Sequence, residues 1–405
     1  MRNRSPFLAT LLVASVSASL LTADPQKRKK KDDDLVLPPV LEPIVESKKR
    51  KKSEEITQTL EALPDPPGAV VAETAKLVFH VAPMSAKGLL SQQVRDGIKA
   101  LWRLNHDAAI VKLRAFVAGT GDLRRVQAVA SDVFTERRLA LPVLTVVQVG
   151  ALPMEGAQVV LESFSAARKA VNPHGLAFIS GQAVPSEESP TAVAPLAAKS
   201  IVNLRAALAG AGLAGPDVVR VTCFSSSLED APAVRRLFAA EFPQAAWNLV
   251  QMQRGHTRGL VECEAVARLR KAPAKALEML NPHGLPSSPN YSQVALVGGP
   301  KVVLSGMQLA FRAQDSDVRL AFERLGKLVE PAGVTLRDVA MSSIYPLSAL
   351  ITDRVRGLRF EYYDRGRPPA STMLPFEGLP SLDASFALDV IAVPGGQASP
   401  PSNPR

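Results

Sequence analysis

Residues of the types that do chemistry are scattered through this sequence without the spacing of a known catalytic or metal-binding motif. The chain has five histidines with no ligand spacing to one another, His80, His106, His174, His256 and His283. Its two cysteines, Cys223 and Cys263, do not have zinc or haem spacing. The sequence contains no P-loop, dinucleotide fingerprint, nucleophile elbow or HExxH pattern. We therefore predict no metal and no cofactor, so any site must be assembled by the fold.

A repeated pentapeptide indicates how the chain is divided. The sequence Asn-Pro-His-Gly-Leu at 172–176 recurs identically at 281–285, about one domain length further on. After each copy, alternating or β-branched runs predict strands, and apolar residues three and four positions apart predict helices. The same order, more weakly marked, precedes both. We predict three tandem α+β domains over 75–166, 172–270 and 281–394, each with two helices packed on one sheet.

The best-marked stretch of the chain follows the second pentapeptide. Two short β-like runs, Gln293–Val297 and Lys301–Leu304, are separated by Gly298-Gly299-Pro300. This spacing predicts a hairpin whose second strand ends in Ser305-Gly306.

The N-terminus is typical of an export signal. Arg2 and Arg4 precede an apolar run from Phe7 to about Leu21, which is short for a membrane span. We predict a signal peptide over 1–23 and a periplasmic or secreted protein, with an uncleaved anchor or the leader of a cytoplasmic protein as the alternatives. In an oxidising compartment Cys223 and Cys263 can pair, and otherwise they are inert packing residues.

Residues 24–74 combine charge blocks with prolines, among them KRKKKDDD and SKKRKKSEE. Such a segment cannot bury enough apolar surface to offset the entropy of ordering, so we predict a disordered linker, and a second disordered tail over 395–405. The net charge of +10 includes these basic clusters. They favour weak, salt-sensitive attraction to anionic surfaces, and no specific nucleic-acid partner is expected.

The predicted β-β-α-β-α-β-β order resembles the Rid family, the reactive intermediate deaminases of RidA type, also known as L-PSP endoribonucleases. The motifs that carry the resemblance are Tyr291-Ser292-Gln293, Ser305-Gly306, Pro369-Ala370 and Leu379-Pro380. It is strong over 281–394, fair over 172–270 and mainly architectural over 75–166. The resemblance implies three chorismate-mutase-like domains. Because family members form homotrimers with ligand clefts between protomers, it also implies an intrachain pseudo-trimer that is a monomer in solution and binds a small-molecule ligand.

The resemblance also implies candidate site residues. The family's water-positioning glutamate falls on Glu262, and on Val160 and Ala387 in the other two segments. The candidate catalytic residue is therefore Glu262. The candidate substrate-binding residues are the family's tyrosine and the two Ser-Gly pairs that hold the ligand through their backbone, namely Tyr291, Ser180, Gly181, Ser305 and Gly306. In the first segment the Ser-Gly pair is replaced by Val81-Ala82.

The family's carboxylate-binding arginine is missing from all three segments. Its position holds Leu144, then Ala245 or Trp247, then Ser371, and no other residue type binds a carboxylate in the same bidentate way. Arginines close to these positions are Arg254, Arg258, Arg365 and Arg367. One hypothesis is hydrolytic deamination of a small enamine or imine in a cleft between segments. The other is a non-catalytic ligand-binding or scaffold protein, in which Glu262 only pairs with a basic neighbour. For RNA cleavage we find no support beyond the basic tail.

Overall fold

The computed structural model describes residues 62–186, 192–254 and 258–396. The predicted signal peptide, most of the predicted linker, the C-terminal tail and His256 lie outside the described residues. No helix in these described ranges is long and apolar enough to cross a membrane.

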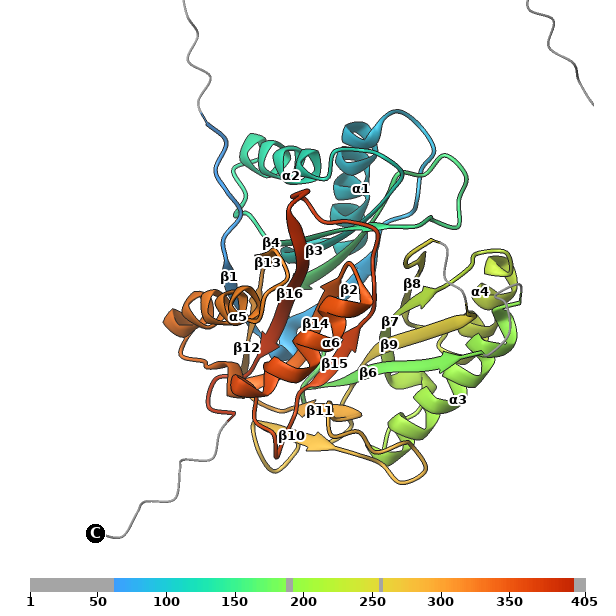
Figure 1. Cartoon of the computed structure of the whole chain (residues 1–405), viewed down its shortest axis with the longest axis vertical. Coiled ribbons are helices and arrows are strands. Elements are labelled where there is room, and N and C mark those ends of the chain that lie inside the picture. The colour runs from blue at the N-terminus through green and yellow to red at the C-terminus, as the bar shows by residue number, and fades with distance from the viewer. Residues whose placement is uncertain (1–61, 187–191, 255–257, 397–405) are drawn as a thin grey trace, which may run out of the picture. The chain divides into compact units, whose positions relative to one another are not determined.

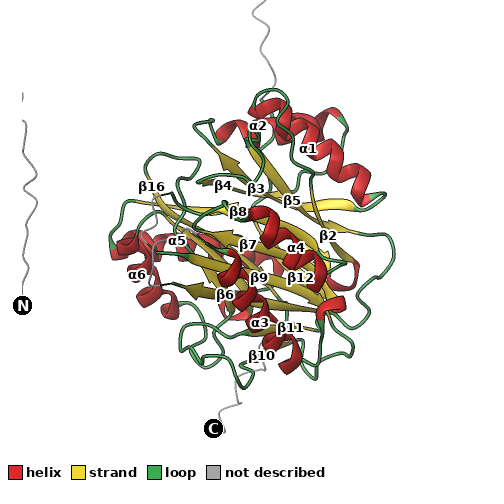
Figure 2. Ribbon diagram, turned by 90° about the vertical axis from the view of Figure 1, so that its right-hand side faces the viewer, coloured by secondary structure: helices red, strands yellow, loops and turns green. Residues whose placement is uncertain are grey.

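Three β-sheets, each with its own pair of helices, make up the described chain (Figures 1 and 2). The first sheet has the order β2-β5-β3-β4, with β2 at Leu77–Val81, β3 at Ala109–Ala118, β4 at Val143–Val149 and β5 at Val159–Ala166. Its helices are α1 at Leu90–Asn105 and α2 at Arg124–Glu136. On α1, the apolar spacing of Val94, Ile98 and Leu101 buries one stripe of the helix against this sheet.

The second sheet has the order β10-β11-β6-β9-β7-β8. Its strands are β6 at Leu176–Pro185, β7 at Val218–Ser225, β8 at Ala246–Gln251, β9 at Leu260–Arg268, β10 at Leu277–Leu280 and β11 at Val294–Val297. Its helices are α3 at Ala194–Gly210 and α4 at Ala231–Glu241. Cys223 on β7 lies opposite Cys263 on β9, with a Cα–Cα distance of 4.1 Å, and the two form a disulfide. The structure thus favours pairing over the inert-packing alternative.

The third sheet has the order β1-β12-β16-β14-β15, with β13 also paired to β16. Its strands are β1 at Ala69–Glu73, β12 at Lys301–Ser305, β13 at Gln308–Phe311, β14 at Val339–Pro346, β15 at Ala370–Met373 and β16 at Ala384–Ala392. Its helices are α5 at Asp315–Val329 and α6 at Ala349–Leu358. In each sheet one central strand has a parallel neighbour, to which a helix connects it, and an antiparallel neighbour, the closing strand. Helices and mixed sheets of this kind confirm the α+β class.

The predicted hairpin is wrong. β11 pairs with β6 in the second sheet, with Val294 opposite Ile179, whereas β12 pairs with β1 and β16 in the third. Both backbone N–H groups of Gly298 and Gly299 donate to the Ala276 carbonyl instead of closing a two-strand turn. Since the predicted runs are buried on both faces, each can complete any open apolar edge, and a glycine-rich turn does not specify which.

The ordered chain also begins earlier than predicted. Residues 69–73, which we assigned to the linker, form β1 and pair along their whole length with β12. The prolines just before them concealed the short β-like run Ala-Val-Val-Ala-Glu. β1 therefore lies in the third sheet although the next strand, β2, lies in the first. In the same way β11 lies in the second sheet although β12 lies in the third.

The faces turned away from the helices pack together. One buried apolar cluster combines Phe164 of the first sheet, Phe178 of the second and Met341 of the third. A second combines Phe116, Phe224 and Tyr345, with ring centroids of Phe116 and Phe224 5.9 Å apart. The three sheets thus share one interior, and that interior positions the candidate site.

Candidate functional site

Glu262 lies on β9 in the shared interior and is only 7% exposed. Among the described residues, no cation forms an ion pair with its carboxyl group, so the pairing alternative is not what the structure shows. Burial, and to a lesser extent the Glu264 carboxylate, raises the pKa of Glu262 to about 8. A carboxyl group with such a pKa can donate or accept a proton near neutral pH.

Gly181 on β6 makes room for this carboxyl group. A Cβ atom added at Gly181 would lie 1.9 Å from Oε1 of Glu262, far inside van der Waals contact. The strand register is broken between Ile179 and Gln182, so the Ser180-Gly181 pair sits at a bulge that turns its backbone toward Glu262. Position 181 therefore needs glycine, because the Glu262 carboxyl approaches its backbone so closely.

Ser180 connects the second sheet to the third. Its Oγ donates to the carbonyl of Ser292 at 2.6 Å and accepts from the backbone N–H of Ser371 at 2.8 Å. Ser371 occupies the arginine position of the resemblance, and its own Oγ has no partner. The fold thus brings the Ser-Gly pair of the second segment together with the arginine position of the third, which holds serine in place of the cation.

Tyr291 joins the same place through the strand that changes sheets. It is half-buried, just before β11, which pairs with β6. Burial raises the pKa of its phenol, and the Glu262 carboxylate raises it further, so the two side chains lie within electrostatic reach. Four predicted site residues therefore come together, and they are Ser180, Gly181, Glu262 and Tyr291.

Ser305 and Gly306 lie elsewhere, between the third and first sheets. The N–H of Gly306 donates to the Gly68 carbonyl at 2.7 Å, and the N–H of Met307 donates to the Leu144 carbonyl at 2.9 Å. A hollow of about 190 Å³ remains beside this pair, walled by Pro66, Pro67 and Gly68 and by apolar side chains such as Leu144. The Gly306 N–H, which the resemblance assigns to ligand binding, therefore donates to a backbone carbonyl of the chain itself.

The arginine position of the second segment is decided by register. In the parallel strand pairs, Leu144 lies opposite Leu113, Ser371 opposite Ser342, and Trp247 opposite Val221. In each sheet, the next residue along these two strands lies at the level of the buried carboxylate on the closing strand, so the three positions are equivalent. Trp247 rather than Ala245 therefore takes this position. Its indole packs near Phe238, with ring centroids 6.3 Å apart.

The four arginines proposed from proximity in sequence do not reach Glu262 as ion-pair partners. The Arg254 side chain donates to the Gly150 carbonyl at 2.6 Å, and Arg367 pairs with Asp364 at 3.3 Å. Sequence reasoning missed Arg359 instead. It is buried immediately after α6, and its guanidinium donates to the Asn290 carbonyl, next to Tyr291. A lone arginine at a helix end gives no sequence signal for such burial.

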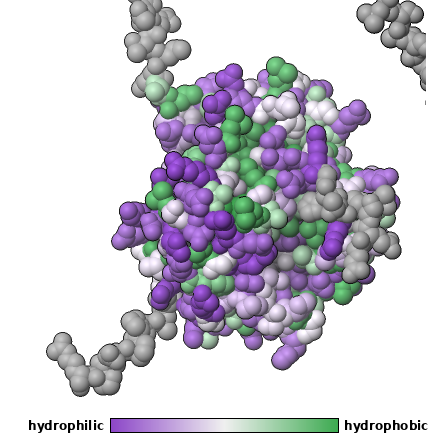
Figure 3. All heavy atoms as spheres, viewed as in Figure 1, coloured by the Kyte–Doolittle hydropathy of each residue, from purple (hydrophilic) through white to green (hydrophobic). Residues whose placement is uncertain are grey.

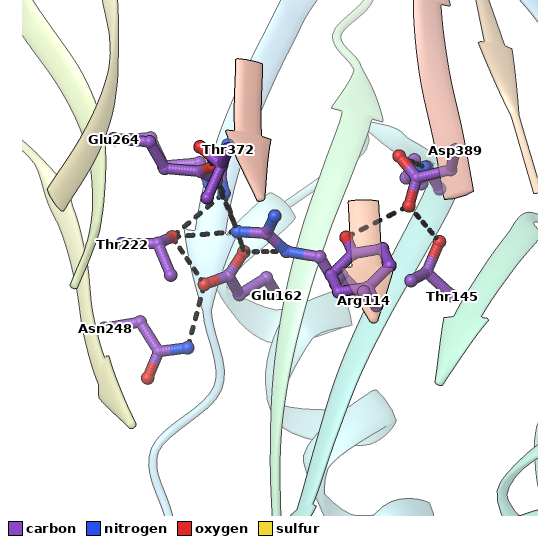
Figure 4. Close-up of polar contacts among 11 residues, drawn as sticks. Arg114, Thr145, Glu162, Thr222, Asn248, Glu264, Thr372 and Asp389 are labelled. Carbon is purple, nitrogen blue, oxygen red and sulfur yellow. Dashed lines mark hydrogen bonds and ion pairs between the residues drawn. The ribbon is translucent and has the colours of Figure 1, made fainter. Parts of the chain in front are cut away.

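A buried ionic cluster fills the centre between the three sheets (Figure 4). Arg114 on β3 pairs with Glu162 at 2.9 Å and with Glu264 at 2.8 Å. Arg220 on β7 pairs with the same two carboxylates at 3.1 and 2.6 Å. Lys112 pairs with Asp389 at 2.9 Å. Three cations and three carboxylates thus balance in the buried interior, as buried charges require.

The carboxylates of this cluster are bonded in a ring from sheet to sheet (Figure 4). Each lies at the same register position of its closing strand and accepts from the parallel edge strand of the next sheet. The three bonds are Asn248 Nδ2 to Glu162 at 2.8 Å, Thr372 Oγ1 to Glu264 at 2.6 Å, and Thr145 Oγ1 to Asp389 at 2.8 Å. The first sheet receives from the second, the second from the third, and the third from the first.

Electrostatics keep the cluster ionised. The Arg114 and Arg220 guanidinium groups outweigh burial and hold the pKa of Glu264 at about 2. Glu262, two residues earlier on the same face of β9, lacks such partners, and its pKa moves the opposite way. The two glutamates therefore differ in protonation at neutral pH because of their partners alone. Alternating charges within apolar strands, as in Val-Lys-Leu-Arg, were the available sequence signal for the cluster.

No group of three or more His, Cys, Asp or Glu side chains that could hold a metal ion is found in the described part of the chain.

Residues 160–269 match the family model described as Endoribonuclease L-PSP, which covers about a quarter of the chain. The match lies over the second segment, which carries Ser180, Gly181 and Glu262, and confirms the Rid-type resemblance there. No curated protein matches the chain.

Solved structures of the same family are similar to parts of the chain. A Rid-family protein of Yersinia pestis is 18% identical, over 29% of this chain and 98% of its own, with a TM-score of 0.26. A YjgF/YER057c/UK114-family protein of Mycobacterium tuberculosis is 20% identical, over 29% and 98%, with a TM-score of 0.22. TdcF of E. coli, solved with bound serine, is 19% identical, over 25% and 93%, with a TM-score of 0.21.

Proposed function

We propose that this chain is a Rid-type protein in which three covalently joined segments replace three protomers, and that it hydrolyses small imines or enamines at Glu262. The ring of hydrogen bonds through Glu162, Glu264 and Asp389 supports the pseudo-threefold arrangement, because one bond type recurs between each pair of sheets. A single chain arranged in this way would be a monomer in solution, of about 40 kDa for three domains.

The observation that carries the proposed activity is the unpaired, buried carboxyl of Glu262. At the equivalent register positions the other sheets have Val160, opposite Phe116, and Ala387, opposite Tyr345. An apolar residue is therefore compatible with this place in the fold. A buried carboxyl there costs stability, which points to a role other than packing. With a pKa of about 8, the Glu262 carboxyl can position a water molecule and can transfer a proton to the nitrogen that leaves as ammonia.

The three inter-sheet places are not equivalent in what they offer a substrate. Between the first and second sheets, Val81-Ala82 stands in place of the Ser-Gly pair and Trp247 in place of the arginine. The place between the third and first holds Ser305-Gly306, but Gly68 is bonded to it and Ala387 stands where the second sheet has Glu262. Among the described residues, the place with Ser180 and Gly181 is the one where the Ser-Gly pair lies beside the family's glutamate, Glu262, so we assign the reaction to it.

Absence of the family's arginine favours a substrate without a carboxylate at this spot. The experiment is to generate imines in situ with an amine oxidase or an amino-acid oxidase and to measure ammonia release with the purified full chain. We expect acceleration over the buffer control, greater for imines lacking a carboxylate. Glu262→Gln should abolish it, while Glu155→Gln, at an exposed position, should not. No rate above buffer with either imine class would contradict the proposal.

A non-catalytic role is the second candidate, and two hydrogen bonds of Ser180 favour it. Ser180 Oγ already donates to Ser292 and accepts from Ser371, so groups that would face a ligand bond to each other. If ammonia release is absent while a ligand stabilises the fold, this candidate replaces the first. Export from the cytoplasm is proposed for either case, supported by the Cys223–Cys263 disulfide, since such bonds persist in oxidising compartments.

A further inference from the structure

The Arg359 side chain is a buried cation that has no anionic partner among the residues the structure describes. It is 2% exposed, its Nη2 donates to the Asn290 carbonyl at 2.5 Å, and its Nε has no hydrogen-bond partner. No described carboxylate forms an ion pair with it, and the charged and phenolic groups that act on it are Tyr363, Arg356 and Tyr291. Burial lowers its pKa to about 10, which leaves it charged at neutral pH. Burying an unpaired charge is costly, so an uncompensated guanidinium calls for a reason.

An open hollow lies against the residues that hold Arg359. Its volume is about 550 Å³, and its walls include Asn290, Phe360 and Arg365. The guanidinium carbons of Arg359 and Arg365 lie 5.2 and 5.3 Å from the centre of the Phe360 ring. The hollow therefore has Arg365 and Arg356 on its wall, and Arg359 lies behind the wall residues Asn290 and Phe360. The surface over α5 and α6 is predominantly hydrophilic on this side (Figure 3).

The remaining charges of the hollow cancel. Arg356 and Asp353 both line it and pair with each other at 2.6 Å. Arg359 and Arg365 have no such partner among the described carboxylates, so the hollow carries a net positive potential of two guanidinium groups. An anion therefore fits this hollow, because two unpaired guanidinium groups attract negative charge.

We propose that this hollow binds a small organic carboxylate, with the carboxylate against Arg365 and above Arg359 and the apolar part against Phe360. Guanidinium and carboxylate groups match in planarity and hydrogen-bonding geometry, and the aromatic ring offers apolar contact. The site is separate from Glu262 and does not depend on the activity proposed for it. It adjoins that site through Asn290, which immediately precedes Tyr291.

The test uses benzoate as the probe and isothermal titration calorimetry with the full chain. We expect saturable 1:1 binding that Arg365→Gln weakens roughly tenfold, the equivalent of one charge-assisted hydrogen bond. Arg324→Gln is the matched control, since it removes an exposed arginine of α5 that forms no described ion pair, and it should leave the affinity unchanged. Arg359→Lys should keep measurable binding, because it keeps the buried charge.

Three results would overturn the proposal. They are no saturable heat with benzoate at millimolar concentration, an equal effect of Arg365→Gln and Arg324→Gln, and tighter binding of inorganic phosphate than of benzoate. Benzoate binding should persist in Glu262→Gln even where ammonia release is lost. A protein that binds benzoate but releases no ammonia would therefore contradict the proposed function and not this site.

Discussion

The carboxyl group of Glu262 occupies the space that a side chain at Gly181 would need, with Oε1 only 1.9 Å from the position of the missing Cβ. The two residues lie on neighbouring antiparallel strands, β6 and β9, at the bulge in their register. The glycine therefore determines where the carboxyl can lie, and the strand pairing holds both.

Substituting Gly181 should disturb this relationship directly. We expect Gly181→Ala to destabilise the protein by about 1–3 kcal/mol, because added volume in a packed interior forces neighbours to move. The Glu262 carboxyl is the group that must move, so any ammonia release should fall as well. Chemical denaturation measures the first effect. Gly326→Ala on α5 is the control, since its nearest contact would be an ordinary 3.8 Å from Leu336, and we expect no loss of stability there.

The pKa of Glu262 gives stability a defined dependence on pH. In the folded chain it is about 8, above its ordinary value near 4.5, so the folded state binds this proton more tightly than the unfolded state. The contribution of this proton to the free energy of unfolding is fully present below about pH 4.5 and is lost as the pH rises through 8. The loss amounts to at most about 1.4 kcal/mol per pH unit. Denaturation of wild type at pH 5, 6.5 and 8 should show this loss relative to Glu262→Gln. Parallel curves for the two proteins would show that the carboxyl is not buried as described.

The ring of bonds between sheets should be uniform in strength if the three sheets are equivalent. Thr145→Val and Thr372→Val each remove the hydroxyl donor to a buried carboxylate, so each should cost about 1–3 kcal/mol. Thr135→Val, at an exposed site on α2, is the control and should change stability by less than about 0.5 kcal/mol. Equilibrium unfolding of the three variants measures the costs. A large cost for one threonine and none for the other would argue against equivalent sheets.

Acid should weaken the same cluster. The arginines hold the pKa of Glu264 at about 2, below its ordinary value, so its contribution is present above about pH 4.5 and is lost as pH falls toward 2. Glu264→Gln leaves Arg114 and Arg220 with too few anions, and we expect a loss of about 3–5 kcal/mol at pH 7. Thermal unfolding of wild type between pH 5 and pH 2.5 should show a falling midpoint, and the variant should show less of this fall.

The Cys223–Cys263 disulfide spans 40 residues of the second segment. Replacing both cysteines by serine should cost roughly 2–5 kcal/mol, chiefly because the unfolded chain gains freedom. Thiol titration in denaturant should find no free thiol before reduction and two after it. Two free thiols in protein isolated under non-reducing conditions would contradict the bond.

The sequence alone determined the local elements and their order. Apolar spacing along α1, with Val94, Ile98 and Leu101, requires one buried stripe, and the copied pentapeptide marks the same turn twice. The resemblance, which rests on local motifs, also gave Ser180-Gly181 and Glu262 as candidates. The boundaries of three tandem domains stay predictions, as does the export signal.

Only the tertiary structure decided which strands and side chains meet. Alternation along β11 shows that it is buried, but any open edge satisfies its backbone groups, so pairing with β6 rather than β12 could not be read locally. The contact of Thr372 with Glu264 joins residues 108 positions apart. Such partners are chosen by how three sheet faces pack, and the burial of Arg359 beside Asn290 follows from the same packing. Periodicity specifies the face of an element, while the identity of its neighbour is a property of the whole fold.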